Sequence, residues 1–200
     1  MKKKKGLKMI KFIKKHKTVS LFIFVITTLV LSAFYIQLNS VRNELDLLEK
    51  YDLVGLSTEE IVSRLDSITS EDKGFKASIT ATKLTMSENG VEVEYNVSSD
   101  LFYLSFAPYI NNTHPCKTHY LSSCRSELIN ELFKVTITND SGEVLFSKEV
   151  KSMENGFVGI WLPSGIKGTL KINYGDKTAE SEISTLSTDN TCLTEPLRLK

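Results

Sequence analysis

The pattern of hydrophobic and polar positions divides the chain into segments of different kinds. Near the N-terminus, residues 18–38 form an uncharged apolar stretch. Its length at helical rise is about 30 Å, which matches the hydrocarbon core of a bilayer. Residues 1–17 contain nine lysines and no acidic residue. Because lysine-rich flanks stay in the cytoplasm, we expect a single transmembrane anchor with everything after it exported.

A cleaved signal peptide is the alternative interpretation of the same start. The triplet Leu31-Ser32-Ala33 is a poor match to a cleavage site, and no cysteine follows nearby that could carry a lipid. We therefore expect a retained anchor in the cell membrane, with a cleaved, secreted or periplasmic form as the second choice. Both alternatives place the rest of the chain outside the cytoplasm.

Two helical patterns follow the anchor. Residues 39–55 have apolar positions at helical spacing and are expected to form a stalk or linker. Residues 55–68 predict a helix, because Ser57 is a good N-cap and Glu60 completes a capping box. The apolar stripe of this helix consists of three residues, Ile61, Leu65 and Ile68. Its charged residues are expected to face solvent, namely Glu59, Arg64 and Asp66.

From Phe75 onward the pattern changes to an alternation with a period of two. The runs "KASITATKLTM" and "VEVEYNV" predict two strands joined by the turn at residues 87–90. The run "LFYLSFAPYI" is apolar on both faces, which predicts a buried strand, a segment facing a partner, or a strand running into a site. Residues 116–132 are expected to be helical, because Leu128 and Leu132 are in helical register.

After Phe133 the chain consists of five short alternating runs separated by turn residues, which predicts a sandwich or barrel. The expected fold class is α+β, with an N-terminal membrane anchor helix. A small α+β unit over residues 56–132 carries the first two cysteines. An antiparallel β-sandwich-like domain over residues 133–200 follows and carries the third cysteine in its C-terminal tail.

The charge balance excludes one class of function. The net charge of the whole chain is +1, from 25 basic and 24 acidic residues. Without the nine lysines of residues 1–17, 16 basic residues face 24 acidic ones, so the exported part carries about −8. Such a chain lacks the basic surface that binds nucleic acid. The lysine run is better explained as a topology signal and a contact with anionic lipids.

The candidate chemistry lies in "THPCKTHYLSSC", residues 113–124, which holds two of the three cysteines and two of the three histidines. These are His114, Cys116, His119 and Cys124, and the remaining cysteine is Cys192. The chain has no Gly-rich phosphate loop, HExxH or GxSxG, so we do not expect an enzyme. It also lacks the close cysteine pairs of a zinc ribbon and the C-x-x-C of a thioredoxin-like site.

Two uses of the cysteines remain open at this point. Soft thiolates with imidazole in reach suit copper, particularly Cu(I). A disulfide is the other use in an exported chain, and an odd count then leaves one thiol over. The residue types and their spacing favour neither a metal site nor a structural disulfide.

Three segments resemble the CueP family of periplasmic copper-binding proteins. They are "FYLSFAPYINNTHPCKTHYLSSCRSEL", the later "NGFVGIWLPSGIKGTL", and a terminal "TCL" followed by "LRL". The resemblance runs from about Lys76 to Leu199, and all three family cysteines have counterparts. The chain departs from the family pattern at Ser126, where the family usually has glycine, and in its N-terminal anchor.

The resemblance implies a copper site built on the thiols of Cys116, Cys124 and Cys192, which would hold Cu(I). We expect His119 and His114 to act as helper ligands, with a smaller effect than the cysteines and with His119 ahead of His114. A gap of 68 positions separates Cys124 from Cys192. The C-terminal tail must therefore bring Cys192 back toward the other two thiols.

The resemblance also implies a role in copper resistance, storage or delivery outside the cytoplasm. An exported copper enzyme such as a Cu,Zn superoxide dismutase is the implied recipient. Two thiols can reduce Cu(II) to Cu(I) while forming a disulfide, a stoichiometric step rather than an enzymatic one. Two other functions remain open. One is a disulfide-stapled module that binds another envelope protein, and the other is a thiol-disulfide redox protein.

Overall fold

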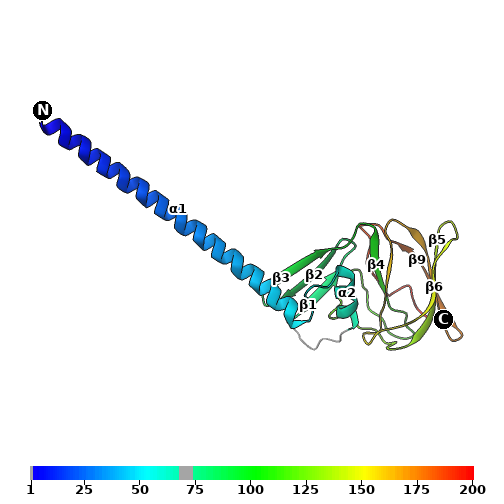
Figure 1. Ribbon diagram of the computed structural model, residues 1–200. Coiled ribbons are helices and arrows are strands. Elements are labelled where there is room, and N and C mark those ends of the chain that lie inside the picture. Colours follow the sequence, from blue (N-terminus) through cyan, green and yellow to red (C-terminus); the bar gives the residue numbers. More distant parts are fainter. Residues whose placement is uncertain (1, 68–73) are drawn as a thin grey trace. The chain divides into compact units, whose positions relative to one another are not determined.

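The computed structural model describes residues 2–67 and 74–200, and the chain divides into two units, Met1–Glu49 and Lys50–Lys200 (Figure 1). Helix α1 (Lys2–Lys50) forms the first unit and extends one residue beyond it. It continues without a break through the expected anchor and through the expected stalk as far as Lys50, whereas residues 51–55 are not helical. Its segment Phe24–Lys50 is long and apolar enough to cross a membrane, a property that a signal sequence near the N-terminus shares.

Helix α2 (Thr58–Ser67) begins with the predicted capping box. The amide of Glu60 donates to Ser57 Oγ at 3.3 Å, and the amide of Ser57 donates to Glu60 Oε2 at 2.8 Å. The two hydrogen bonds satisfy backbone donors that the helix itself cannot pair. Ile61 and Leu65 of the predicted stripe are buried, whereas Ile68 lies outside the described residues.

The strands that follow form a three-stranded antiparallel sheet of β1 (Lys76–Ile79), β2 (Lys83–Glu88) and β3 (Val91–Asn96). The predicted turn is present, with positive φ at Asn89 and Gly90. One expectation was wrong, because residues 76–86 form two strands rather than one. Hydrogen bonds between Thr80 and Lys83 close a tight turn there, so β1 folds back onto β2.

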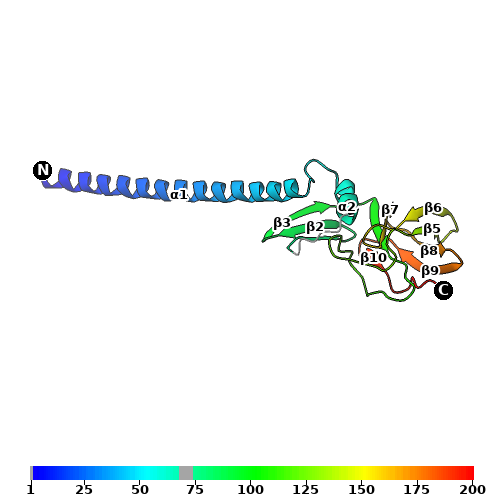
Figure 2. The same ribbon diagram turned by 90° about the horizontal axis from the view of Figure 1, so that it is seen from below.

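The remaining strands form two further sheets. One sheet consists of β4 (Leu101–Phe106), β7 (Val158–Pro163) and β10 (Cys192–Leu193). Its order is β10-β4-β7, and β4 pairs in parallel with β10 and antiparallel with β7. The other is antiparallel with the order β6-β5-β8-β9, as Figure 2 shows; its strands are β5 (Leu132–Asn139), β6 (Val144–Lys151), β8 (Lys167–Tyr174) and β9 (Lys177–Ser184).

The main hydrophobic core is built from side chains of both these sheets. Phe102 and Phe106 of β4 are buried together with Phe133 of β5 and Leu170 of β8. Two sheets that share one apolar core form a sandwich. The predicted α+β fold class is therefore confirmed. The five predicted runs form strands β5 to β9, and the short strand β10 follows them.

The place of β4 within its sheet explains why residues 101–106 are apolar on both faces. This strand is the middle strand of its sheet and is buried on both sides. Its partner β7 lies on the far side of the division expected between residues 132 and 133, so the pairing crosses that division. The three cysteines are consequently attached to one compact unit of the chain.

The helix expected within residues 116–132 is absent, and that expectation was wrong. Several backbone groups of this segment pair with other elements, and the amides of Ser123 and Cys124 both donate to the carbonyl of Tyr120 in a local turn. The carbonyl of His119 accepts from Ile79, the amide of Ser126 donates to Asn155, and the carbonyl of Lys117 accepts from Cys192. A backbone group used in these long-range bonds is not available for helical pairing, so tertiary contacts override the apolar spacing.

Candidate metal centre

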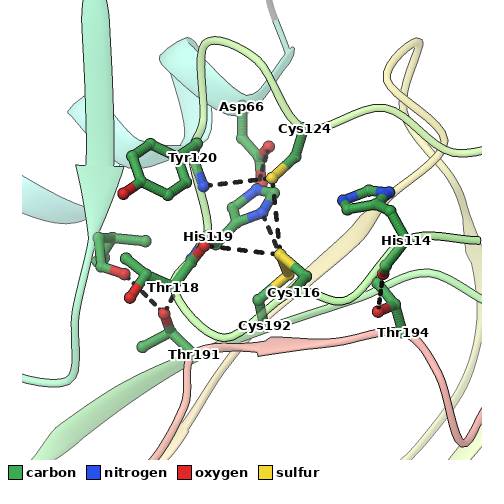
Figure 3. The surroundings of a disulfide bond; sticks show 11 residues. Asp66, His114, Cys116, Thr118, His119, Tyr120, Cys124, Thr191, Cys192 and Thr194 are labelled. Atoms are coloured by element: carbon green, nitrogen blue, oxygen red, sulfur yellow. Dashed lines mark hydrogen bonds and ion pairs between the residues drawn. A yellow bond between two sulfur atoms is a disulfide. The ribbon is translucent and has the colours of Figure 1, made fainter.

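The loop between β4 and β5 carries Cys116, His119 and Cys124, and β10 carries Cys192 (Figure 3). Strand β10 pairs in parallel with β4, with Cys192 opposite Ser105. The amide of Cys192 also donates to the carbonyl of Lys117 at 3.1 Å, next to Cys116. These backbone bonds bring the C-terminal tail back to the loop, as the sequence required.

The sulfur atoms form one disulfide and leave one free thiol. Cys116 is bonded to Cys192, which is 76 positions away in the sequence. The free thiol of Cys124 is buried, and its Sγ lies 3.7 Å from the Sγ of Cys116. The amide of Tyr120 donates to Cys124 Sγ at 3.4 Å and fixes its position. A disulfide is thus present in the same place where a metal site was expected.

Four possible ligand atoms converge, because those of Cys116, His119, Cys124 and Cys192 all lie within 4.8 Å of one another. Among the described residues, His114 stands outside this group. Its carbonyl accepts a hydrogen bond from Thr194 at 2.6 Å, and Figure 3 shows its ring apart from that of His119. The role of all five residues as metal ligands stays a prediction.

His119 is fully buried, and its two ring nitrogens have different neighbours. Nε2 lies 2.8 Å from Asp66 Oδ1, and Nδ1 lies 4.0 Å from Cys192 Sγ. Burial alone would lower the pKa of His119, but the hydrogen bond to Asp66 and the neighbouring Cys124 sulfur raise the pKa to about 9. Without metal the ring is therefore an imidazolium at neutral pH.

Asp66 is the functional residue that the sequence analysis missed. It was expected to face solvent but is fully buried near the end of α2. Tyr103 donates from its hydroxyl to Oδ2 at 2.5 Å, and Asn155 donates from Nδ2 to Oδ1 at 2.7 Å. The available signal was Val62, which is buried, precedes Asp66 by four positions and therefore shares its helix face.

Tyr103 reaches Asp66 because the neighbouring strand has a glycine. A Cβ atom added to Gly159 would lie 1.7 Å from the Tyr103 hydroxyl oxygen. Burial, together with the negative charge of Asp66, raises the pKa of Tyr103 well above its usual value. Asn155 and Gly159 both belong to the segment "NGFVGIWLP", so part of that segment's pattern serves this buried network.

Glu127 holds the start of the loop that carries the cysteines. Its carboxylate accepts from the backbone amides of Ile110, Asn111 and Asn112. Burial raises the pKa of Glu127, but these three donors outweigh it and lower the pKa. The preceding Ser126 keeps a buried hydroxyl without a hydrogen-bond partner among the described residues.

A surface pocket gives access to the sulfur atoms. It is lined by Cys116 and Cys124 and also by His114, Lys117 and Arg125. Cys116 is partly exposed, whereas Cys124 and Cys192 are buried. An ion or a small thiol can therefore reach the cluster from solvent, and it meets Cys116 on the exposed side.

A largely buried cluster of three sulfurs and one imidazole on a β-sandwich is a candidate site for a soft metal. The family model described as "Periplasmic copper-binding protein CueP" matches residues 60–197. The chain belongs to this family. The match begins earlier than the expected Lys76 and includes Asp66. The family description places its members outside the cytoplasm, in agreement with the predicted export.

A solved structure described as "Crystal Structure of S.CueP" is similar in both fold and sequence. The two chains are 42% identical with a TM-score of 0.75, and the alignment covers 78% of this chain and 97% of that one. A search of curated proteins finds no match. The resemblance seen in the sequence is therefore confirmed by two comparisons.

The donor set fits copper, because three sulfurs and an imidazole are the soft and intermediate ligands that Cu(I) prefers. The fit depends on the redox state. A disulfide sulfur is not a thiolate, so of these four groups the oxidised protein offers the Cys124 sulfur and the His119 ring. Reduction of the Cys116–Cys192 bond completes the set.

The buried His119 predicts a pH dependence of the oxidised, metal-free protein. Its pKa is raised from 6.5 to about 9 in the folded state, so its stabilising contribution is complete below pH 6.5. This contribution is lost as the pH rises toward 9. We expect the free energy of unfolding to fall over that range, as followed by the fluorescence of Trp161, the single tryptophan, in detergent micelles.

The matched variants are His119→Gln and His114→Gln. The first removes the titrating ring and should flatten the pH profile between 6.5 and 9. The second should retain the parent's fall in stability. An equally steep fall in the His119→Gln variant would show that another group is responsible.

Proposed function

We propose that the reduced protein binds Cu(I) outside the cytoplasm through the thiolates of Cys116, Cys124 and Cys192. Nδ1 of His119 serves as an additional ligand. The observation that carries this proposal is the convergence of these four ligand atoms within 4.8 Å, in a chain of a copper-binding family. His114 lines the entry pocket and is given a smaller role than His119.

We further propose that copper binding is coupled to the redox state of the site. When Cys116 and Cys192 form their S–S bond, the two thiols release two electrons and two protons. Two Cu(II) ions accept the electrons and become two Cu(I) ions. The disulfide in the structure corresponds to the product of this reaction. The step consumes the thiols, so it is stoichiometric and does not make the protein an enzyme.

The N-terminal helix is proposed to remain in the membrane as a single anchor. The apolar length of Phe24–Lys50 and the lysines before it support this arrangement. In the cell, the tethered site would serve copper resistance, storage or delivery to an exported copper enzyme such as a Cu,Zn superoxide dismutase. Recovery of activity by the metal-free dismutase, when mixed with the copper-loaded protein, would distinguish delivery from storage.

The full chain, reduced and in detergent micelles, should take up Cu(I). We expect about one tightly bound Cu(I) per chain, because three thiolates and an imidazole complete one coordination shell. Elemental analysis gives the amount bound, and competition with a chromophoric Cu(I) chelator gives the affinity. The triple variant Cys116→Ser, Cys124→Ser, Cys192→Ser should lose this binding. His119→Ala should weaken it less, and His114→Ala least.

Two controls accompany this measurement. Ser123→Ala changes an exposed residue of the entry pocket that has no soft ligand atom and should leave the affinity unchanged. The oxidised parent should bind Cu(I) more weakly than the reduced parent. Copper binding by the triple variant equal to that of the parent would refute the proposal. No metal uptake, with a disulfide that survives reduced glutathione, would instead favour the stapled interaction module.

The proposed redox step predicts that the reduced protein reduces Cu(II). Reduced protein mixed with Cu(II) without oxygen should yield about two Cu(I) for each disulfide formed, since one S–S bond supplies two electrons. The absorbance of a Cu(I) chelator measures the Cu(I) formed, and thiol titration measures the loss of free thiols. Cys124→Ser should retain the reaction, because the bonded pair is Cys116 and Cys192. A Cys124→Ser variant that cannot reduce Cu(II) would assign the electrons to another pair.

The proposed anchor predicts that the protein stays in the membrane. The full chain should sediment with membranes after a high-salt and carbonate wash, because an apolar helix of this length does not leave the bilayer. External protease should remove the part that contains Trp161 from intact cells. A shorter chain released in soluble form would show that the N-terminal segment is a cleaved signal sequence.

A further inference from the structure

We propose that Asp66 is a positioning residue of the copper site, which holds the His119 ring so that Nδ1 faces the sulfur atoms. The inference rests on the proposed function, because it assigns a task within the copper site. Asp66 lies on α2, far in sequence from the loop and the strand that carry the sulfurs. The 2.8 Å contact between Asp66 Oδ1 and His119 Nε2 joins α2 to this loop.

The two nitrogens of an imidazole ring point in different directions, so fixing one of them directs the other. A carboxylate accepts a hydrogen bond, so Nε2 must carry a proton to bond with Asp66. When copper replaces the proton on Nδ1, the lone pair of Nδ1 points toward Cys192 Sγ, which is 4.0 Å away. A carboxylate bonded to the far nitrogen of a ligating histidine fixes both the ring orientation and the tautomer.

Asp66 is itself held in place by two further side chains. The Tyr103 hydroxyl donates to Oδ2 at 2.5 Å, and Asn155 Nδ2 donates to Oδ1 at 2.7 Å and to the Asp66 carbonyl at 3.0 Å. Asn155 and Asp66 are buried to 1% and 0% exposure. A carboxylate bound by donors from three different elements cannot turn away from His119 without leaving buried donors unpaired.

The same bonds keep Asp66 out of the ligand set. Its Oδ1 atom already accepts from both His119 and Asn155. Asp66 is absent from the group of possible ligand atoms that converge within 4.8 Å. Its effect on copper therefore passes through His119, which distinguishes it from the cysteines. The set around the metal stays soft, without a hard carboxylate oxygen that would favour other ions.

The test uses the full chain in detergent micelles, reduced and loaded with Cu(I), with ¹⁵N label only in histidine. The chain has three histidines, so the ring signals are few. In the parent protein, the His119 signals should show Nδ1 bound to Cu(I) and Nε2 carrying its proton. Asp66→Ala should lose this signature, with Nδ1 no longer bound. Its Cu(I) affinity should fall by about 10- to 100-fold.

Three variants separate positioning from folding. Asp66→Asn keeps an acceptor oxygen of the same shape and should restore binding through Nδ1, with a smaller loss of affinity. Tyr103→Phe removes one donor to Asp66 and should cause an intermediate loss, which provides a test if Asp66→Ala does not fold. Asp100→Ala removes an exposed aspartate and should change neither the signals nor the affinity. Trp161 fluorescence reports folding in every case.

The outcomes are distinguishable from those of the proposed function. A parent protein that takes up no Cu(I) on its thiolates would refute both proposals. A parent that binds Cu(I) while Nδ1 stays unbound would overturn only the inference about Asp66. The same conclusion follows if Asp66→Ala retains both the Nδ1 signature and the parent affinity.

Discussion

The contact between Asp66 and His119 is the interaction on which the arrangement of the site depends. It joins α2 to the loop that carries two cysteines, at a place where both side chains are fully buried. Burial of an ion pair is costly unless further hydrogen bonds satisfy the carboxylate. Tyr103 and Asn155 supply these bonds, and Gly159 leaves the space that Tyr103 needs. Residues of β4, β7 and the turn at Asn155 thus position the His119 ring.

The three sulfur atoms have two mutually exclusive uses. In the oxidised state, Cys116 and Cys192 link the loop to the C-terminal strand, and Cys124 remains a thiol. Under the proposed function, the same atoms hold a soft metal in the reduced state. Strand β10 is also joined to β4 and to the loop by backbone hydrogen bonds, so contacts other than the disulfide hold the C-terminal strand beside the loop. Under the proposed function, a change of redox state changes the set of sulfur ligands at this place.

Several features of the fold follow from local sequence patterns. The capping box at Ser57 marked the start of α2, and alternation with turn residues located the five strands after Phe133. Local spacing failed where long-range pairing takes over. The segment with Leu128 and Leu132 has helical spacing, but its backbone is used in bonds to β1, β10 and the turn at Asn155. Asp66 looked like a solvated charge, because its partners lie in distant parts of the chain.

The sequence by itself determined the apolar N-terminal segment, strands β5 to β9, the family and the three cysteines of the candidate site, because each depends on residues that are close together or on a recognisable order of motifs. Only the tertiary structure decided which two cysteines are bonded, that His119 joins the sulfurs while His114 stands apart, and that Asp66 is buried. The physical reason is that disulfide pairing and burial depend on distances between segments, which a parallel β10–β4 contact and a buried hydrogen-bond network set in space.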